Sequence, residues 1–129
     1  MTRLDPETFT YSELDGHWQV WESEQLGQFE IAVMPTESFA PAPWALEQLE
    51  RELARIEALF DAALVAAKSG WGETYGRCAP ETGWSLERIA IEEDGGVTVE
   101  VYEGEIDTYG AWDVAMRDGA ALGVKRRQI

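Results

Sequence analysis

The sequence has very few of the residues that most often build catalytic and metal sites. Its 129 residues include one cysteine, Cys78, and one histidine, His17. A single cysteine excludes a disulfide within the chain, which favours a cytoplasmic protein over a secreted one held together by disulfides. A closed zinc site made of Cys and His ligands is excluded for the same reason. We therefore expect no metal and no cofactor.

Long apolar runs are also missing. No stretch approaches the roughly 18 apolar residues that a transmembrane helix requires. The first residues, MTRLDPETFTYSELDG, lack the apolar centre of a signal peptide. We expect a cytoplasmic protein that does not insert into membranes. The length suits one domain, 1–129, because a chain of this size can bury about two-thirds of its unfolded surface.

Positive charge is scarce. The sequence has 10 Lys and Arg residues against 25 Asp and Glu residues, so its formal net charge is −15. The phosphate backbone of a nucleic acid would be repelled, and we expect no nucleic-acid binding. An acidic surface instead suits a basic protein partner, although the same surface also keeps a protein soluble. Both interpretations stay open from composition alone.

The longest periodic pattern predicts one amphipathic helix over Pro43–Lys68. Apolar residues recur every three or four positions, with charged residues on the opposite face. The apolar stripe consists of Leu46, Leu49, Leu53, Ile56, Phe60, Ala63 and Ala67. Such a helix would be roughly 39 Å long, whereas a six-residue strand spans about 20 Å. We expect the helix either to overhang its sheet or to break near Asp61.

The second half of this helix, residues 62–67, is small and apolar on all sides. A helix that is apolar all round is normally buried. Burial within the monomer explains this segment, and so does contact with a second copy. A homodimer through residues 62–67 therefore stays open.

Most of the remaining chain alternates as β-strands do. The runs 9–12, 17–23 and 28–34 predict an N-terminal meander, and 84–92, 97–102, 111–117 and 121–126 predict a four-strand C-terminal meander. The alternation slips between Leu86 and Ile89, which predicts a bulge, and Asp118-Gly119 predicts a turn. The fold class is therefore α+β, an antiparallel sheet with one long helix on one face.

Residues 69–82, SGWGETYGRCAPET, are predicted to form an irregular glycine-rich loop. The glycine spacing matches neither the dinucleotide-binding fingerprint nor the Walker loop. No nucleophile signature surrounds the cysteine in this segment. A pocket for a small ligand or an enzymatic reaction is nevertheless an alternative, and its residues would be His17, Trp71, Tyr75 and Cys78.

Two further sets of side chains are candidates for a functional site. Glu103, Glu105 and Asp107 alternate as ligands of Ca²⁺ or Mg²⁺ do, but they lack the spacing of a calcium loop, and a solvated connection explains them equally well.

One helix would leave the other face of the sheet open. The partner-binding residues expected on that face are Trp21, Glu22, Glu30, Glu100 and Tyr102. An aromatic patch bordered by acids suits protein recognition, whereas packing under loops is the simpler explanation.

The order of elements, with the run IEEDGGVTVEVYEGEIDTYGAWDVAMRDG, resembles small bacterial families of domains of unknown function. The resemblance is architectural and covers the chain from Phe9 to about Val124. Its most specific piece is the strand–DGG–strand–acidic-turn–strand run from Ile89 to Met116. Such families often carry a histidine where this sequence has Gly110-Ala111-Trp112, so no functional residue is transferred. Some of them are immunity proteins of toxin–antitoxin-like systems, and the resemblance implies that association.

The resulting prediction is a non-enzymatic, acidic, cytoplasmic binding protein that covers a basic protein partner, as an immunity-type inhibitor would. Electrostatic attraction would then speed the association and make it sensitive to salt. The alternatives are a small enzyme or ligand-binding domain at the glycine-rich loop, and a homodimeric structural module.

Overall fold

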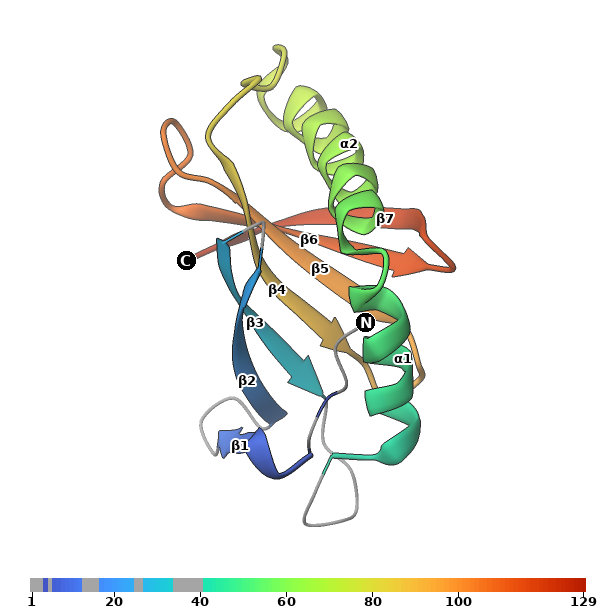
Figure 1. The fold of residues 1–129 in the computed structure, drawn as a ribbon. Coiled ribbons are helices and arrows are strands. Elements are labelled where there is room, and N and C mark those ends of the chain that lie inside the picture. Colours follow the sequence, from blue (N-terminus) through green and yellow to red (C-terminus); the bar gives the residue numbers. More distant parts are fainter. Residues whose placement is uncertain (1–3, 5, 13–16, 25–26, 34–40) are drawn as a thin grey trace.

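A seven-stranded sheet with helices on one face makes up the part of the chain that the computed structural model describes, namely residues 4, 6–12, 17–24, 27–33 and 41–129 (Figure 1). The elements in order are a 3-10 turn at Pro6–Thr8, β1 (Thr10–Ser12), β2 (His17–Glu24), β3 (Gly27–Val33), α1 (Pro43–Leu53), α2 (Ile56–Tyr75), β4 (Trp84–Ile91), β5 (Val97–Glu103), β6 (Gly110–Arg117) and β7 (Ala120–Gln128). The α+β class expected from the sequence is confirmed.

The strands lie in the sheet in the order in which they occur in the chain, from β1 to β7. Neighbouring strands are antiparallel except β3 and β4, which are parallel. The expectation of a wholly antiparallel sheet is therefore wrong at this junction. Both helices lie between β3 and β4 in the chain. They return the chain to the end of the sheet where β3 begins, so that β4 runs in the same direction as β3.

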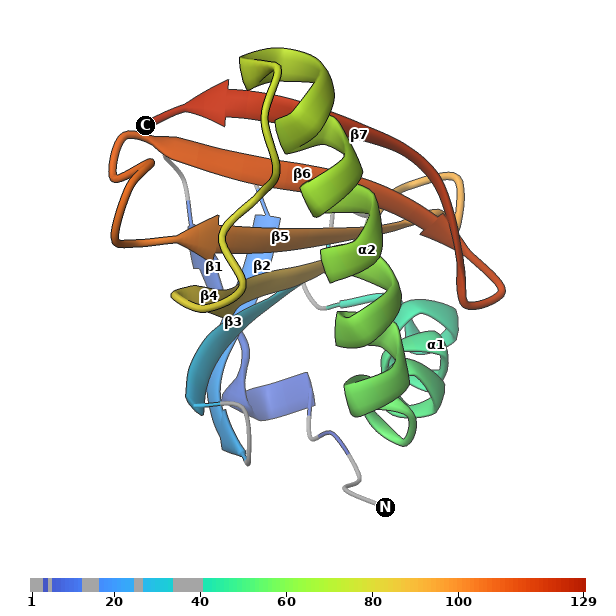
Figure 2. The ribbon, with the colours of Figure 1, turned by 90° about the horizontal axis from the view of Figure 1, so that it is seen from above.

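The single long helix expected over Pro43–Lys68 is two helices, and the break falls at Ala54 and Arg55 rather than near Asp61. Arg55 has φ −126° and ψ 33°, outside the helical range. The break lets α1 contact β4 while α2 lies over β5, β6 and β7 (Figure 2). Because the sheet twists, two helices that differ in direction follow its surface better than one straight helix would.

The glycine-rich segment predicted to be irregular is helical over its first half, since α2 continues to Tyr75 and ends at Gly76, whose φ is +67°. The prediction failed because Gly70 serves packing and not a turn. A Cβ atom at Gly70 would lie 3.0 Å from Cζ3 of Trp112 and 3.0 Å from Cγ1 of Val124. The missing side chain lets α2 approach the sheet closely.

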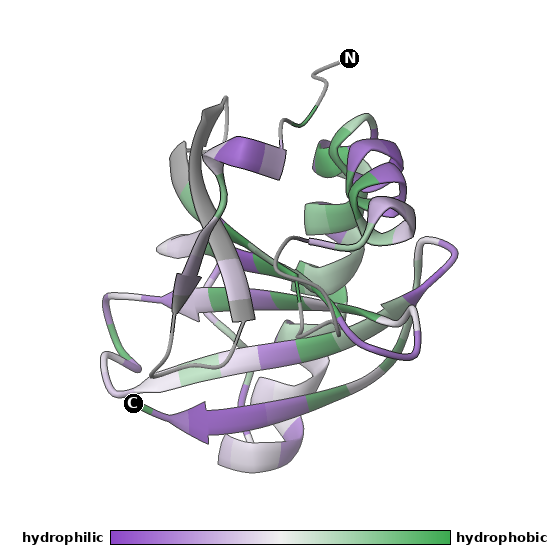
Figure 3. Ribbon diagram, turned by 90° about the horizontal axis from the view of Figure 1, so that it is seen from below, coloured by the Kyte–Doolittle hydropathy of each residue, from purple (hydrophilic) through white to green (hydrophobic). Residues whose placement is uncertain are grey.

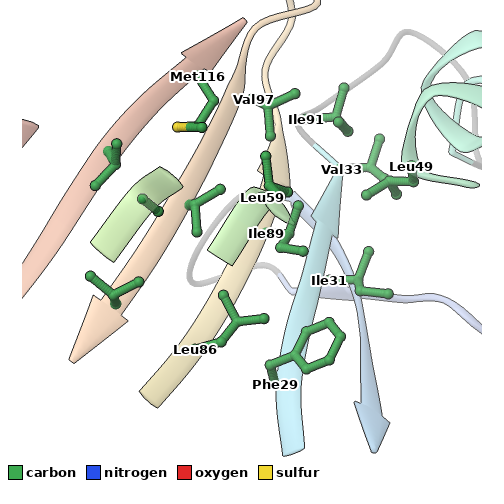
Figure 4. Packing of buried hydrophobic residues seen from close by; sticks show 14 of the residues in the cluster. Phe29, Ile31, Val33, Leu49, Leu59, Leu86, Ile89, Ile91, Val97 and Met116 are labelled. Carbon is green, nitrogen blue, oxygen red and sulfur yellow. The ribbon is translucent and has the colours of Figure 1, made fainter. Parts of the chain in front are cut away.

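The core lies between the sheet and the two helices. Val97, Val99 and Val101 are buried as their alternation predicts, and the predicted bulge is confirmed by a register shift between Leu86 and Arg88. Figure 4 shows side chains of both helices and of the strands meeting in this layer; those labelled are Phe29, Ile31, Val33, Leu49, Leu59, Leu86, Ile89, Ile91, Val97 and Met116.

Segment 62–67 is not buried on all sides. Ala63 and Ala67 are fully buried, but Val65 points away from the sheet and is 72% exposed. Helix geometry decides this, because a helix lying on one sheet buries only one of its faces. Within the described residues, no helix combines the length and apolar character that crossing a membrane requires.

Candidate functional site

A ladder of charged side chains, in which arginines bridge neighbouring acids, crosses the sheet face opposite the helices. It consists of Glu30 on β3, Arg88 on β4, Glu100 on β5, Asp113 on β6 and Arg127 on β7. Nε of Arg88 lies 2.7 Å from Oε1 of Glu30 and 3.9 Å from Oε2 of Glu100. Nη2 of Arg127 lies 2.9 Å from Oε1 of Glu100, and its Nε lies 2.9 Å from Oδ2 of Asp113. The hydrogen bond from Arg127 to Asp113 raises the pKa of the arginine.

This ladder contains two of the residues expected to bind a partner. Glu30 is buried, and Glu100 is half-buried between two arginines. Their negative charges are therefore largely balanced within the molecule. Tyr102 lies two residues further along β5 and donates a hydrogen bond of 3.0 Å to the carbonyl oxygen of Thr108.

The other two expected residues lie on β2. The strand register places Trp21 opposite Glu30, and Glu22 opposite Phe29. The side chains of Trp21 and Glu22 lie outside the described part of the structure. The partner-binding role expected for the five residues stays a prediction.

The alternative pocket residues are only partly brought together. Trp71 and Tyr75 lie one turn apart on α2, with ring centroids 4.8 Å apart. Trp71 is buried in the core against Trp84 and Trp112. Cys78 is exposed beyond the end of α2. His17 opens β2, which β3 separates from β4, and its side chain is outside the described part.

Tyr75 belongs to a polar cluster that the sequence did not reveal. Its hydroxyl donates a hydrogen bond of 3.2 Å to Oδ2 of Asp107. Arg126 binds the same carboxylate with both Nε and Nη2, at 2.9 Å and 2.7 Å. The hydrogen bond from Arg126 lowers the pKa of Asp107, whereas burial and then the negative charge of Asp107 raise the pKa of Tyr75. Asp107 and Arg126 are 19 positions apart in the chain, and no local pattern joins them.

The hydrogen bonds of this cluster hold separate segments of the fold together. Both carboxylate oxygens of Asp107 accept hydrogen bonds, and its pKa is lowered, chiefly by the hydrogen bond from Arg126, so this group is a weaker base than an ordinary aspartate. Tyr75 is protonated at neutral pH, as an ordinary tyrosine is, and burial raises its pKa further. The cluster ties the end of α2 to β7 and to the connection between β5 and β6.

A second buried carboxylate, that of Glu103, orders the connection between β5 and β6. Glu103, the last residue of β5, has no exposed surface. Its Oε1 accepts a hydrogen bond from the backbone N–H of Glu105 at 2.7 Å, and its Oε2 accepts two, from Ile106 and Asp107, both at 2.9 Å. Glu103 therefore binds the backbone of the residues that follow it. In the described residues, no group of three or more His, Cys, Asp or Glu side chains is arranged to hold a metal ion.

The exposed acidic residues lie elsewhere, notably on α2. One row on α2 recurs every four residues and is exposed throughout; its members are Glu57, Asp61, Val65, Ser69 and Glu73. Glu57 and Asp61 are neighbours of like charge, an arrangement that costs a helix about 0.2–0.5 kcal/mol. This helix surface therefore carries unbalanced negative charge toward the solvent.

No family model matches this chain, and neither a curated protein nor a solved structure matches it.

Proposed function

We propose that this chain is a non-enzymatic binding protein that covers a basic surface of another protein, in the manner of an immunity-type inhibitor. The observation that carries the proposal is how the charges are distributed. Among the residues that the structure describes, five cations lie within 4.0 Å of the chain's own carboxylates: Arg55, Lys68, Arg88, Arg126 and Arg127. Three of these five cations lie on the sheet, whereas acids such as Glu57 and Asp61 are exposed on α2.

Such a charge distribution supports fast association with a basic protein. Attraction between a strongly acidic and a basic surface steers the two proteins together and raises the association rate. The attraction weakens as salt increases, because the screening length is about 10 Å at 0.1 M salt. The described titratable groups in the Tyr75 cluster are engaged with one another, which supports binding over catalysis as the function.

The homodimer alternative has one supporting observation, the exposure of Val65 within segment 62–67. The charges around it oppose that contact. Two copies that pack through this helix surface would bring Glu57 and Asp61 of each copy toward the acidic helix of the other. A basic partner meets no such repulsion.

The test is an affinity capture from a lysate of the native cells, performed at low and at high salt, with retained proteins identified by mass spectrometry. We expect one basic protein that is retained at low salt and released at high salt. A triple variant, Glu57→Gln, Asp61→Asn and Glu73→Gln, should retain less of it, whereas Ser69→Ala in the same row should retain as much as the wild type. If neither salt concentration retains a basic protein, the proposed function is wrong.

A further inference from the structure

Residues 104–110, the connection between β5 and β6 together with the first residue of β6, form a loop whose backbone is held by several hydrogen bonds. Figures 1 and 2 show it projecting beyond the sheet, at the end where β7 finishes. Glu103 holds three consecutive N–H groups of this loop, and the N–H of Gly104 donates to the carbonyl oxygen of Gly83 at 3.1 Å. Burying a carboxylate is unfavourable unless it is well hydrogen-bonded. Here that buried group serves to order one short loop.

The second half of the 104–110 loop is held as firmly. Asp107 is fixed by Arg126 and Tyr75, and the hydroxyl of Tyr102 donates to the carbonyl oxygen of Thr108. Gly110 leaves the space for this arrangement, because a Cβ atom there would lie 2.5 Å from Oδ2 of Asp107. A loop that is ordered before binding loses little conformational entropy when it binds.

The side chains that this ordered loop presents to the solvent are apolar. Ile106 is 60% exposed and Tyr109 is 71% exposed. Ile129, 63% exposed, joins them, since its N–H donates to the carbonyl oxygen of Tyr109 at 2.8 Å. Tyrosine in particular contributes strongly to protein interfaces. The fold thus holds the backbone beneath three largely exposed apolar side chains, which contribute little to the core.

We infer that the 104–110 loop is the contact element for a basic partner protein, and that Ile106 and Tyr109 pack against an apolar side chain bordered by lysine or arginine on that partner. Charge complementarity favours a basic protein as the partner of this loop. Glu105 is exposed within the loop, and Arg126, the cation at its base, is already bound by Asp107. A second copy would bring another net charge of −15 against the first. The inference rests on the proposed function and adds the surface that carries it.

The experiment uses the full ¹⁵N-labelled chain and three short peptides of equal length: alternating lysine and leucine, alternating lysine and serine, and alternating glutamate and leucine. We expect the lysine–leucine peptide to bind most tightly and to shift the backbone amide signals of residues 104–110 and 129. Replacing Ile106 and Tyr109 together by serine should weaken its binding roughly fivefold or more. The matched control replaces Leu122 on β7, which is 66% exposed, by serine and should bind as the wild type does.

A further variant separates the order of the loop from its side chains. Glu103→Gln keeps the size of the group but leaves only one acceptor oxygen for three N–H groups. Hydrogen exchange at residues 105–107 should become faster, and the lysine–leucine peptide should bind less tightly although both apolar side chains remain. Unchanged affinity in a variant with faster exchange would show that the order of the loop does not matter for binding.

The other outcomes separate this inference from the proposed function. If both lysine peptides bind equally and shift signals of α2 and not of the loop, the loop assignment is overturned and the proposed function stands. If the glutamate–leucine peptide binds the loop as tightly as the lysine–leucine peptide, the basic partner is the wrong occupant. If no peptide binds, the loop assignment is overturned, and the lysate capture alone decides the proposed function.

Discussion

Nε of Arg88 lies 2.7 Å from Oε1 of Glu30, and this ion pair joins β3 to β4, the parallel neighbours in the described sheet. The junction connects β1–β3 with β4–β7 through four register pairs. Isoleucine and valine side chains hold it on the helix side, and the charge ladder holds it on the other side. Glu30 is therefore a structural residue as well as one expected to bind a partner.

Reversing the charge of Glu30 should destabilise the fold. In Glu30→Lys, a buried lysine would face Arg88, and breaking a buried pair in this way costs about 3 kcal/mol or more. Urea unfolding followed by tryptophan fluorescence gives the change in the free energy of unfolding. Glu93→Lys, in an exposed turn, serves as the control and should unfold near the wild-type midpoint. Equal midpoints for the two variants would show that the Glu30–Arg88 pair adds nothing to stability.

A methyl group at Gly110 should disrupt the cluster at the base of the 104–110 loop. A Cβ atom there would lie 2.5 Å from Oδ2 of Asp107 and 2.6 Å from Nε of Arg126, so these two side chains would have to move from their present positions. We expect Gly110→Ala to lower the free energy of unfolding by roughly 2–4 kcal/mol, measured by thermal denaturation. Gly123→Ala on β7 meets nothing within 4 Å and should change stability by less than about 0.5 kcal/mol. A wild-type melting temperature for Gly110→Ala would refute this account of the loop.

The stability that Asp107 contributes should depend on pH in the acid range. Its pKa is lowered in the folded protein, chiefly by the hydrogen bond from Arg126. Its contribution is therefore fully present above the ordinary carboxyl pKa of about 3.9 and is lost as the pH falls through the lower pKa of the folded state. Asp107→Asn should be less stable than the wild type at neutral pH by about 3 kcal/mol. That difference should shrink below about pH 4.

Urea unfolding over a series of pH values measures this effect for the wild type and for Asp107→Asn. Asp61→Asn removes an exposed carboxyl group from α2 and should follow the wild-type curve closely. A difference between wild type and Asp107→Asn that stays constant down to acid pH would contradict the lowered pKa of Asp107.

The two glycines near the end of α2 should respond in opposite ways to alanine. Gly72→Ala adds a Cβ atom whose nearest neighbour is the carbonyl oxygen of Arg77 at 3.8 Å, so the helix should gain about 0.5–1 kcal/mol. Gly70→Ala places a Cβ atom 3.0 Å from Trp112 and from Val124 in the core, and overpacking of this kind costs about 1 kcal/mol or more. Urea unfolding of the two variants checks the signs. Equal stabilisation by both would mean that α2 does not need Gly70 to approach the sheet.

Patterns that repeat along the chain predicted the local structure well. The alternation of Val97, Val99 and Val101 identified the buried side of β5, because successive strand residues point to opposite faces. Asp118-Gly119 forms the predicted turn, and both residues have positive φ, at 52° and 81°. These features depend on neighbouring residues only, and a short stretch of sequence contains all the information about them.

The features around the candidate site depend on residues that are distant in the chain. Glycines at 70 and 110 resemble turn residues in the sequence, yet each makes room for a side chain from another element. The pairing of Asp107 with Arg126 exists only once β6 and β7 lie side by side. Ile106 and Tyr109 read as ordinary loop residues until the hydrogen bonds of Glu103 show how firmly their loop is held.

The sequence alone therefore determined the α+β class, the alternation of the strands, the turn at Asp118 and the net charge of −15, because composition and short-range periodicity carry each of these. The tertiary structure decided where the long helix breaks, that β3 and β4 run parallel, which acids are balanced by arginines and which remain exposed. Each of these depends on how a twisted sheet brings distant segments together, and the free energy of such contacts has no signature in any local stretch of residues.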